Sequence, residues 1–261
     1  ARSLTMTEAD VMDAARDFVR DCAVGIPLML TNTRMMPGPW TPHLVRLLNA
    51  DDSGAMFRTL AGQDAGEVDP AINNLVQALS GHPFSLGVTA QQIASGSTDA
   101  AAFVNAMPQT PAGEANLAAG VLMAAYRLLP GALQGMVLLV GTAFSGGASA
   151  NLLAGVAGAP EPVLQASLRK LVERGFVIER EANGQSYFSA HSMVQAFAQA
   201  FLRGKKQLDA MCLRHVKGVG AYIERYAMVE GSASDQLAAE MSTILAAAIY
   251  AVEHDQAATV T

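Results

Sequence analysis

The sequence predicts a mainly α-helical chain with a small α/β segment at its N-terminus, and three observations support this class. Apolar residues recur with a helical period over most of the chain. One short apolar run, 26–34, follows a helix and is flanked by glycine and proline, as is typical of a buried strand. One pair of alternating segments surrounds Asn183-Gly184, the dipeptide that most strongly indicates a β-hairpin turn.

The composition is that of a folded chain rich in core-forming residues. Of the 261 residues, 51% are hydrophobic and 15% are charged, which excludes a disordered polypeptide. The formal net charge is -6, and no run of lysine or arginine is present. This balance does not favour a surface that follows nucleic-acid phosphates, since such surfaces are basic.

The cysteines and the apolar stretches indicate a cytoplasmic protein that does not cross a membrane. Cys22 and Cys212 lie far apart and lack the spacing of metal ligands, so we interpret them as thiols in a reducing compartment. No signal peptide is recognisable. The longest uncharged stretch, 128–160, is interrupted by Pro130 and several glycines, which excludes a continuous span of about 20 apolar residues.

The first part of the chain predicts a helix, a strand and a further strand. Apolar residues share one side of a helix over 7–22, and the buried strand 26–34 ends in Arg34. Helix followed by buried strand is half of an α/β unit. A second short strand is predicted at 44–48, and the acidic pair Asp51-Asp52 then begins a helix.

A helix pair and a linker are predicted next. The pair covers 70–95 and is joined by Gly81-His82-Pro83. From about Ser95 to Gly113 the chain is rich in serine, threonine, glycine and proline, which indicates a linker and a domain boundary.

The following part predicts helices around a single hairpin. Helices are expected at 114–128, 131–143, 148–157 and 161–174, and Gly175 ends the last of them as a C-terminal cap. The segments "FVIER" and "SYFSA" then form the hairpin. Three of these helices in succession followed by the hairpin give the element order of a winged-helix domain.

The last part predicts three more helices. One begins after His191, and an antiparallel pair covers 207–228 and 235–253. The helix at 235–253 is predicted to bury a stripe made of Leu237, Met241, Ile244, Leu245, Ala248 and Val252. One helix pair cannot bury such a face alone, so it is predicted to be the first unit of a helical-repeat array.

Four quoted segments, in this order, resemble the signal-transduction ATPases with numerous domains, known as STAND or NB-ARC-like switch proteins. The segment "PLMLTNTR" resembles their sensor strand, and "ALSGHPFSLGVTAQQIA" resembles their Gly-x-Pro segment. The segment "LQASLRKLVERGFVIEREANGQSYFSAHSMVQAFA" resembles their winged-helix domain, which ends in a histidine motif. The C-terminal segments "LRHVKGVGAYIERY" and "AAEMSTILAAAIYAVEHDQ" resemble the helical (TPR-like) repeats that follow.

The resemblance implies a domain order. Residues 1–48 are expected to be the C-terminal part of an α/β nucleotide-binding domain, and 49–110 a helical lid. Residues 111–203 are expected to be the winged-helix domain, and 204–261 the start of the repeats.

The resemblance also implies a nucleotide site to which this chain contributes three residues. Arg34 is expected to sense the γ-phosphate, Pro83 to pack on the base, and His191 to contact the diphosphate of ADP. The phosphate-cradling Gly-x-x-x-x-Gly-Lys-Ser/Thr loop and the strand with a magnesium-holding aspartate are missing from the sequence. ADP or ATP with Mg²⁺ is therefore expected to be held mainly by upstream residues.

The function implied is regulatory. The chain is expected to hold the nucleotide-bound off state of a signalling switch and to couple it to an effector or to transcription. The parent would be a slow NTPase, whereas this chain alone has no assigned catalytic or metal-binding residue. The expected partners are the nucleotide, the upstream NTPase portion, the downstream repeats, and further copies on activation. Direct DNA binding is not expected.

Other interpretations of the same residues stay open. His191 can cap or pack at the start of a helix, Arg34 can be a solvated strand end, and Pro83 can serve only as a first helical residue. The chain can also be a winged-helix DNA-binding regulator, or an interaction scaffold without a nucleotide. In the first of these, the predicted helix 161–174 would enter the major groove.

Overall fold

The computed structural model describes residues 13–14, 16–18, 20–21, 41, 43–63, 69–107, 114–144, 147–182, 185–227 and 233–254. They belong to two compact units, Ala1–Arg46 and Leu47–Thr261. In the first unit the described residues between 13 and 21 are helical, which confirms the predicted helix there. The predicted strand 26–34 lies outside the described residues.

The second unit begins with four helices, which we call the first helical segment: α2 (Ala50–Ala61), α3 (Pro70–Ala78), α4 (Pro83–Ala94) and α5 (Ala100–Ala106). Short polar side chains begin three of them. Asn49, Asp69 and Asp99 each accept a hydrogen bond from a backbone N–H of the first turn, at α2, α3 and α5. Helix α2 packs on α4, and α3 packs on both α2 and α5. The predicted helix pair at 70–95 is therefore confirmed.

Two sequence-based predictions fail in this segment. Residues 44–48 form no strand; Leu44, Val45 and Leu47 are exposed, and no neighbouring strand pairs with them among the described residues. The predicted linker contains a helix, α5, because Asp99 caps the apolar run that follows and Phe103 is fully buried. With 7 residues, α5 is too short for hydrophobic periodicity to predict it.

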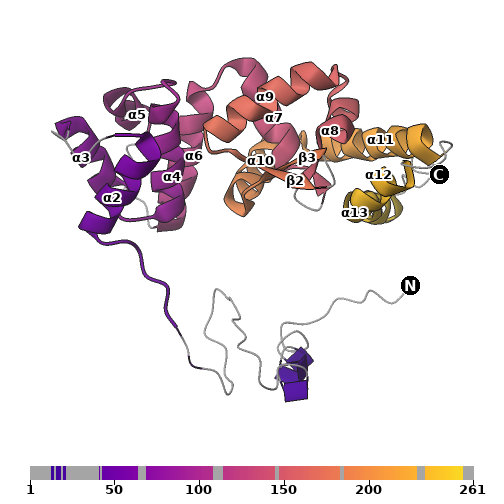
Figure 1. Ribbon diagram of the computed structural model, residues 1–261, viewed down its shortest axis with the longest axis horizontal. Helices are drawn as coiled ribbons and strands as arrows, with labels where there is room; N and C mark the ends of the chain where they lie inside the picture. The colour runs from indigo at the N-terminus through magenta and orange to yellow at the C-terminus, as the bar shows by residue number, and fades with distance from the viewer. Residues whose placement is uncertain are drawn as a thin grey trace. The chain divides into compact units, whose positions relative to one another are not determined.

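Helix α6 (Glu114–Leu128) contacts both the first helical segment and the elements that follow. It has the predicted bounds. It packs against α4 and α5 on one side and against α10 on another. It lies between these groups of helices in Figure 1.

The next elements form what we call the sheet segment. They are α7 (Gly131–Gly141), β1 (Gly147–Ser149), α8 (Ala150–Ala157), α9 (Glu161–Glu173), β2 (Val177–Ala182), β3 (Gln185–Ala190) and α10 (Ser192–Gly204). The strands form an antiparallel sheet in the order β1-β3-β2. Phe188 of the central strand is opposite Ala148 on one side and Glu179 on the other.

The sheet corrects the prediction of a single hairpin. The predicted strands around Asn183-Gly184 are β2 and β3, but β1 adds a third strand, and α8 begins after it. Three residues of β1 carry no periodic signal. They are a strand only because they pair with β3. In this pairing Ala148 lies opposite Phe188, 40 positions later in the sequence.

The C-terminal helices are α11 (Leu208–Ala227), α12 (Ala233–Ala239) and α13 (Met241–Glu253), which replace the predicted pair. The predicted continuous helix 235–253 is interrupted at Glu240. The predicted buried stripe is wrong in part, since Leu237 and Ile244 do pack against the core but half of its members do not. Met241, Leu245 and Val252 are 46%, 55% and 67% exposed, whereas the buried residues of α13 are Thr243, Ala247 and Ala251. These small residues lie on the buried side of α13, which packs against α11.

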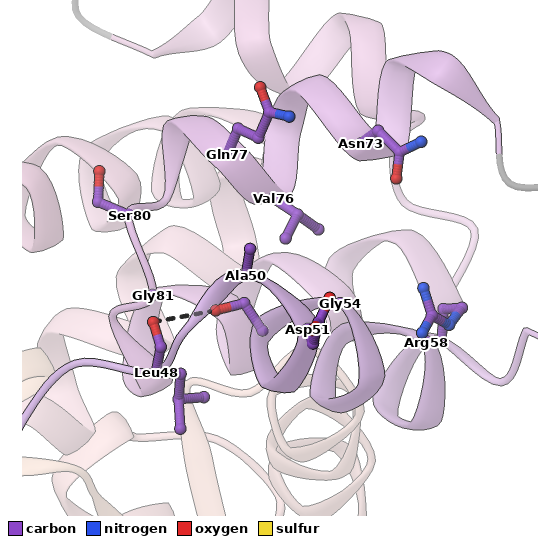
Figure 2. Close-up of a pocket in the computed structure, with 11 residues that line it drawn as sticks. Leu48, Ala50, Asp51, Gly54, Arg58, Asn73, Val76, Gln77, Ser80 and Gly81 are labelled. Atoms are coloured by element: carbon purple, nitrogen blue, oxygen red, sulfur yellow. Dashed lines mark hydrogen bonds between the residues drawn. The ribbon is translucent and has the colours of Figure 1, made fainter.

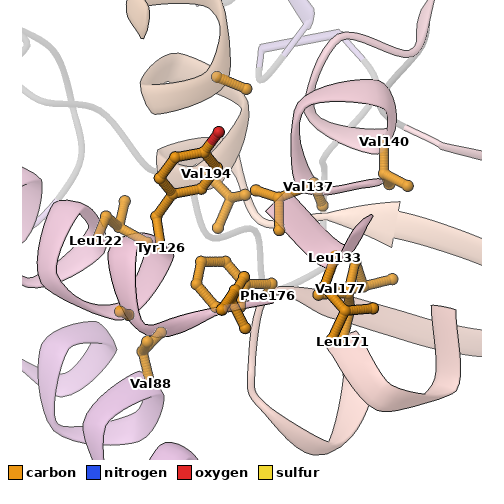
Figure 3. Close-up of a cluster of buried hydrophobic side chains, with 14 of the residues drawn as sticks. Val88, Leu122, Tyr126, Leu133, Val137, Val140, Leu171, Phe176, Val177 and Val194 are labelled. Carbon is orange, nitrogen blue, oxygen red and sulfur yellow. The ribbon is translucent and has the colours of Figure 1, made fainter. Parts of the chain in front are cut away.

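One continuous apolar core joins the first helical segment to the sheet segment (Figure 3). Phe176, which precedes β2, is fully buried at its centre. Val88 of α4 and Tyr126 of α6 lie on one side of this ring, and Leu171 of α9 lies on the other. Because one side chain fills the space between three helices, these elements are expected to depend on each other for stability.

No helix in the described part of the chain is long and apolar enough to cross a membrane.

Candidate functional site

The backbone that leads into α4 makes a close contact that requires glycine. Gly81 has a φ of 72°, and a Cβ at this position would lie 2.1 Å from the carbonyl oxygen of Leu48. The Leu48 N–H donates to the Gly81 carbonyl over 2.9 Å. Pro83 then begins α4, at a position where an N–H is not needed. The Gly-x-Pro segment is thereby fixed against Leu48, which precedes α2.

His82 caps α4 through its imidazole. The Ser85 N–H donates to His82 Nδ1 over 3.3 Å, and the Ser85 hydroxyl lies 3.0 Å from the same atom. Since Nδ1 accepts the backbone N–H, it carries no proton, and in the neutral ring the proton is on Nε2. No role was expected for His82 from the sequence.

His191 makes the same arrangement at α10. It follows β3, is exposed at the surface, and its Nδ1 accepts a hydrogen bond of 3.2 Å from the Met193 N–H. The Gln195 side chain donates to the Ala190 carbonyl over 2.8 Å, which fixes the passage from strand to helix. The interpretation of His191 as a helix cap is thus confirmed, and in its neutral ring the proton is on Nε2.

The two capped helix ends meet through an aromatic contact. The Phe84 ring stacks on the His191 ring, with centroids 4.5 Å apart and planes inclined by 28°. Phe84 directly follows Pro83, so the Gly-x-Pro segment and the histidine motif form one joint between α4 and α10. We call His82, Pro83, Phe84 and His191 the histidine joint.

The electrostatics of the histidine joint keep His191 neutral. His191 is exposed overall, but its partial burial against its neighbours lowers its pKa, and the nearby His82 lowers it further. A neutral imidazole is required for the Nδ1 cap, because a protonated ring has no acceptor nitrogen. At pH 7 His191 therefore presents an uncharged N–H donor rather than a positive charge.

The other end of α4 contacts the sheet segment through polar groups. The Gln92 amide donates to the Arg174 carbonyl over 3.0 Å, and Arg174 Nε donates to the Ser97 hydroxyl over 2.7 Å. Gly175 adopts a φ of 76°, and a Cβ there would lie 2.3 Å from Gln91 Oε1. The sheet segment therefore contacts α4 at both of its ends.

This second contact contains polar atoms that are not satisfied. Among the described residues, three buried side-chain oxygens of α4 have no hydrogen-bond partner: Thr89 Oγ1, Gln91 Oε1 and Gln92 Oε1. A buried acceptor without a donor costs free energy that an apolar contact would not. The packing of α4 against the sheet segment is consequently weaker than its buried area alone suggests.

A cleft of about 460 Å³ lies between α2 and α3, beside the contact of Leu48 with Gly81 (Figure 2). Its walls carry one carboxylate, Asp51, one guanidinium, Arg58, and the amides of Asn73 and Gln77. Gly54 leaves room for Arg58, whose Nη1 would be 3.2 Å from a Cβ at that position. The cleft can accept a small polar group, but sequence patterns gave no indication of it.

A second cleft, of about 510 Å³, lies between the end of α7, α10 and α11. It is lined in part by Cys212, whose thiol has a pKa raised mainly by burial. A raised pKa makes the thiolate scarce at neutral pH and the thiol a poor nucleophile. Within the described ranges, no three potential metal ligands come together.

The structure brings together two of the three residues predicted from the sequence. The segment of Pro83 meets His191 through Phe84. Arg34 lies outside the described residues. Sequence reasoning missed Phe84 and Arg174. Phe84 had a signal, since an aromatic residue inside the first turn of a helix needs a packing partner, but its partner is 107 positions away.

Comparison with known protein families finds no family that matches the sequence, and comparison with curated proteins finds no match either.

Proposed function

We propose that this chain is the regulatory module of an ADP/ATP-dependent switch of the STAND type. In this proposal α2–α5 are the lid, α7–α10 with the sheet are the winged-helix domain, and α11–α13 begin the helical repeats. The module holds the ADP-bound off state and transmits its release to an effector or to transcription. Hydrolysis belongs to an upstream portion with a phosphate loop.

The observation that carries the proposal is the stack of Phe84 on His191. Two motifs that resemble family motifs lie far apart in the sequence, and nothing in helix or strand periodicity requires them to meet. Their meeting at one joint is what a shared ligand site would need. The resemblance and the contact are independent observations that support the same function.

The chemistry of the histidine joint fits a nucleotide. The neutral imidazole of His191 has its Nδ1 engaged by Met193 and its Nε2–H available as a donor. A phosphate oxygen is a strong acceptor for such a group. Pro83 offers an apolar ring at the same helix end, suited to the face of a base. These residues would hold the nucleotide from one side, whereas Mg²⁺ would need ligands from elsewhere.

The interface of α4 with the sheet segment supports a switch of two states. It combines an aromatic stack, a few polar contacts and three unsatisfied oxygens. Such an interface can separate at lower cost than a fully apolar one. A ligand that contacts both sides shifts the equilibrium by the difference in its affinity for the two states.

The contacts of α9 do not favour the alternative of a DNA-reading winged helix. Arg174 is engaged by Ser97 and by the Lys170 carbonyl, and Arg169 Nε lies 3.9 Å from a carboxylate oxygen of Glu179. The exposed N-terminal turn of α9 carries Glu161 and Val163. Repulsion between this acidic turn and phosphates would oppose groove entry.

The test is nucleotide binding by the chain joined to the phosphate-loop portion that the proposal requires. His191→Asn removes the imidazole but keeps an acceptor that can cap α10. We expect ADP affinity to fall about 10- to 100-fold, the loss of one hydrogen bond to a charged group. ATP affinity should change less. Isothermal titration calorimetry measures both.

Two controls separate nucleotide contact from helix capping. His191→Ala removes cap and donor together, and should lower thermal stability in addition to ADP affinity, whereas His191→Asn should not. His43→Ala, at an exposed position before α2, should leave both unchanged. Unaltered ADP affinity in both His191 variants rules out the assigned role. If the chain joined to the phosphate-loop portion binds no nucleotide even without a substitution, the result favours the interaction scaffold.

A further inference from the structure

Two charged residues of the C-terminal helices face the two ends of α8. At its N-terminus, the Ser149 N–H donates to Glu240 Oε1 over 2.7 Å. At its C-terminus, Arg214 donates from Nε to the Val156 carbonyl over 2.6 Å and from Nη2 to the Ala157 carbonyl over 2.5 Å. A carboxylate at the positive end and a guanidinium at the negative end both match the dipole of α8.

The contact at Glu240 also covers the free edge of the sheet. Strand β1 pairs with β3 on one side only. On its other side, the Ser149 N–H meets Glu240, and the Gly147 carbonyl accepts from the Thr243 hydroxyl over 3.2 Å. Side chains thus take the place of a fourth strand, which is one way to protect an edge from pairing with another chain.

The interruption between α12 and α13 is what directs Glu240 inward. Helix α12 ends at Ala239 and α13 begins at Met241, so Glu240 is the joint between them. Its side chain is 2% exposed, although a buried carboxylate is costly unless it is specifically paired. The charge also acts on its surroundings: burial first, and then Glu240, raises the pKa of both Tyr187 and Tyr222.

Apolar packing alone holds α13 weakly. Its fully buried residues are small, namely Thr243, Ala247 and Ala251. Ile244 is partly buried against the core, and Tyr250 packs on Phe144. The other large apolar side chains are exposed: Met241, Leu245, Ile249 and Val252. Elements with little apolar burial open more readily than the core around them. In contrast, α11 is docked independently, through Arg214 and through His215, which contacts the Leu139 carbonyl.

From these contacts we infer that α12 and α13 form a releasable cover of the β1 edge, held closed by the Glu240 carboxylate. Release leaves α11 docked on α8 and exposes the Ser149 N–H and the Gly147 carbonyl. These are the groups with which an edge strand binds an added extended segment. The inference does not depend on nucleotide binding, since the cover and the histidine joint share no residue.

Hydrogen exchange of the whole chain tests the cover. Glu240→Gln keeps the shape of the side chain and removes its charge. We expect about tenfold faster exchange in peptides that cover β1 and α12–α13, with α7, α9 and α10 unchanged, as loss of a charge-assisted hydrogen bond predicts. Glu253→Gln, an exposed change at the end of α13, is the matched control and should have no effect. Unchanged exchange at β1 and α12–α13 in Glu240→Gln overturns the inference.

A second measurement on the unaltered chain decides the matter if Glu240→Gln fails to fold. In increasing low concentrations of urea, the amides of Ser149 and α12–α13 should lose protection before those of α9 and α10. If all of these amides lose protection together, α12 and α13 are an inseparable part of the core, and no releasable cover exists.

Discussion

His215 is the most deeply buried histidine in the described part of the chain, with 1% of its surface exposed. Its Nε2 lies 3.0 Å from the Leu139 carbonyl and 3.3 Å from the Thr142 hydroxyl. The Phe144 ring packs edge-on against it. Burial lowers the pKa of His215 to about 4, against a smaller raising effect of the Leu139 hydrogen bond. The ring is therefore neutral and donates to the end of α7.

The shifted pKa of His215 predicts a loss of stability in acid. In the unfolded chain the pKa is about 6.5, so between about 6.5 and 4 the unfolded state binds the proton and the folded state does not. The contribution of the neutral His215 ring to the free energy of unfolding is complete above pH 6.5. It falls by about 2–3 kcal/mol as the pH drops toward 4. Urea unfolding at pH 7.5 and 4.5 measures this loss.

The comparison with His215→Gln isolates the effect from the carboxylates that titrate in the same range. The variant should be less stable at pH 7.5 but should lose less stability on acidification than the unaltered chain. His43→Gln, at an exposed position before α2, should follow the unaltered chain. Equal losses for His215→Gln and the unaltered chain would contradict the prediction.

At the scale of elements, the turn from α9 to β2 shows how a local signal and a tertiary contact combine. Gly175 ends α9 as the sequence predicts: the Phe176 N–H donates to the Leu171 carbonyl in the pattern of a helix C-terminal motif. The same glycine packs against α4, where a Cβ would lie 3.3 Å from Val88 Cα. The sequence did not indicate that Gly175 is also needed because α4 leaves no room for a side chain there.

Gly175→Ala is expected to lower the free energy of unfolding by about 2 kcal/mol or more. The left-handed conformation alone costs an alanine about 1–2 kcal/mol, and crowding against Gln91 and Val88 adds to it. Gly158→Ala is the matched control, since Gly158 has a φ of 64° but no atom within 4 Å of a Cβ. Chemical denaturation of both variants gives the comparison. Equal losses would show that the contact with α4 carries no weight.

At the scale of the whole molecule, the ring of Phe176 connects the first helical segment with the sheet segment (Figure 3). Phe176→Ala should lower the free energy of unfolding by about 3–5 kcal/mol, because it opens a cavity at a fully buried site. Hydrogen exchange should increase in α4 and α9 together. Val163→Ala, at a position 60% exposed, should change stability by less than about 0.5 kcal/mol. Exchange that increases in α9 alone would mean that the two segments are energetically separate.

The sequence by itself determined most of the helices and the hairpin. Periodicity gave α3, α4, α6 and α9 close to their observed bounds, because each helix has several turns and its own cap signals. It also identified His191 as a helix-start residue, since small and polar residues surround it. These features depend on neighbours within about one or two helical turns, which sequence reasoning can read.

The tertiary structure alone decided how these elements meet. The strand β1, the stack of Phe84 on His191 and the turn at Glu240 all join residues that are distant in the sequence. The same is true of the inner face of α13, where close packing on α11 selects small residues over the large apolar ones that periodicity favoured. Such choices depend on the complementary surface of another element, and a single segment carries no record of that surface.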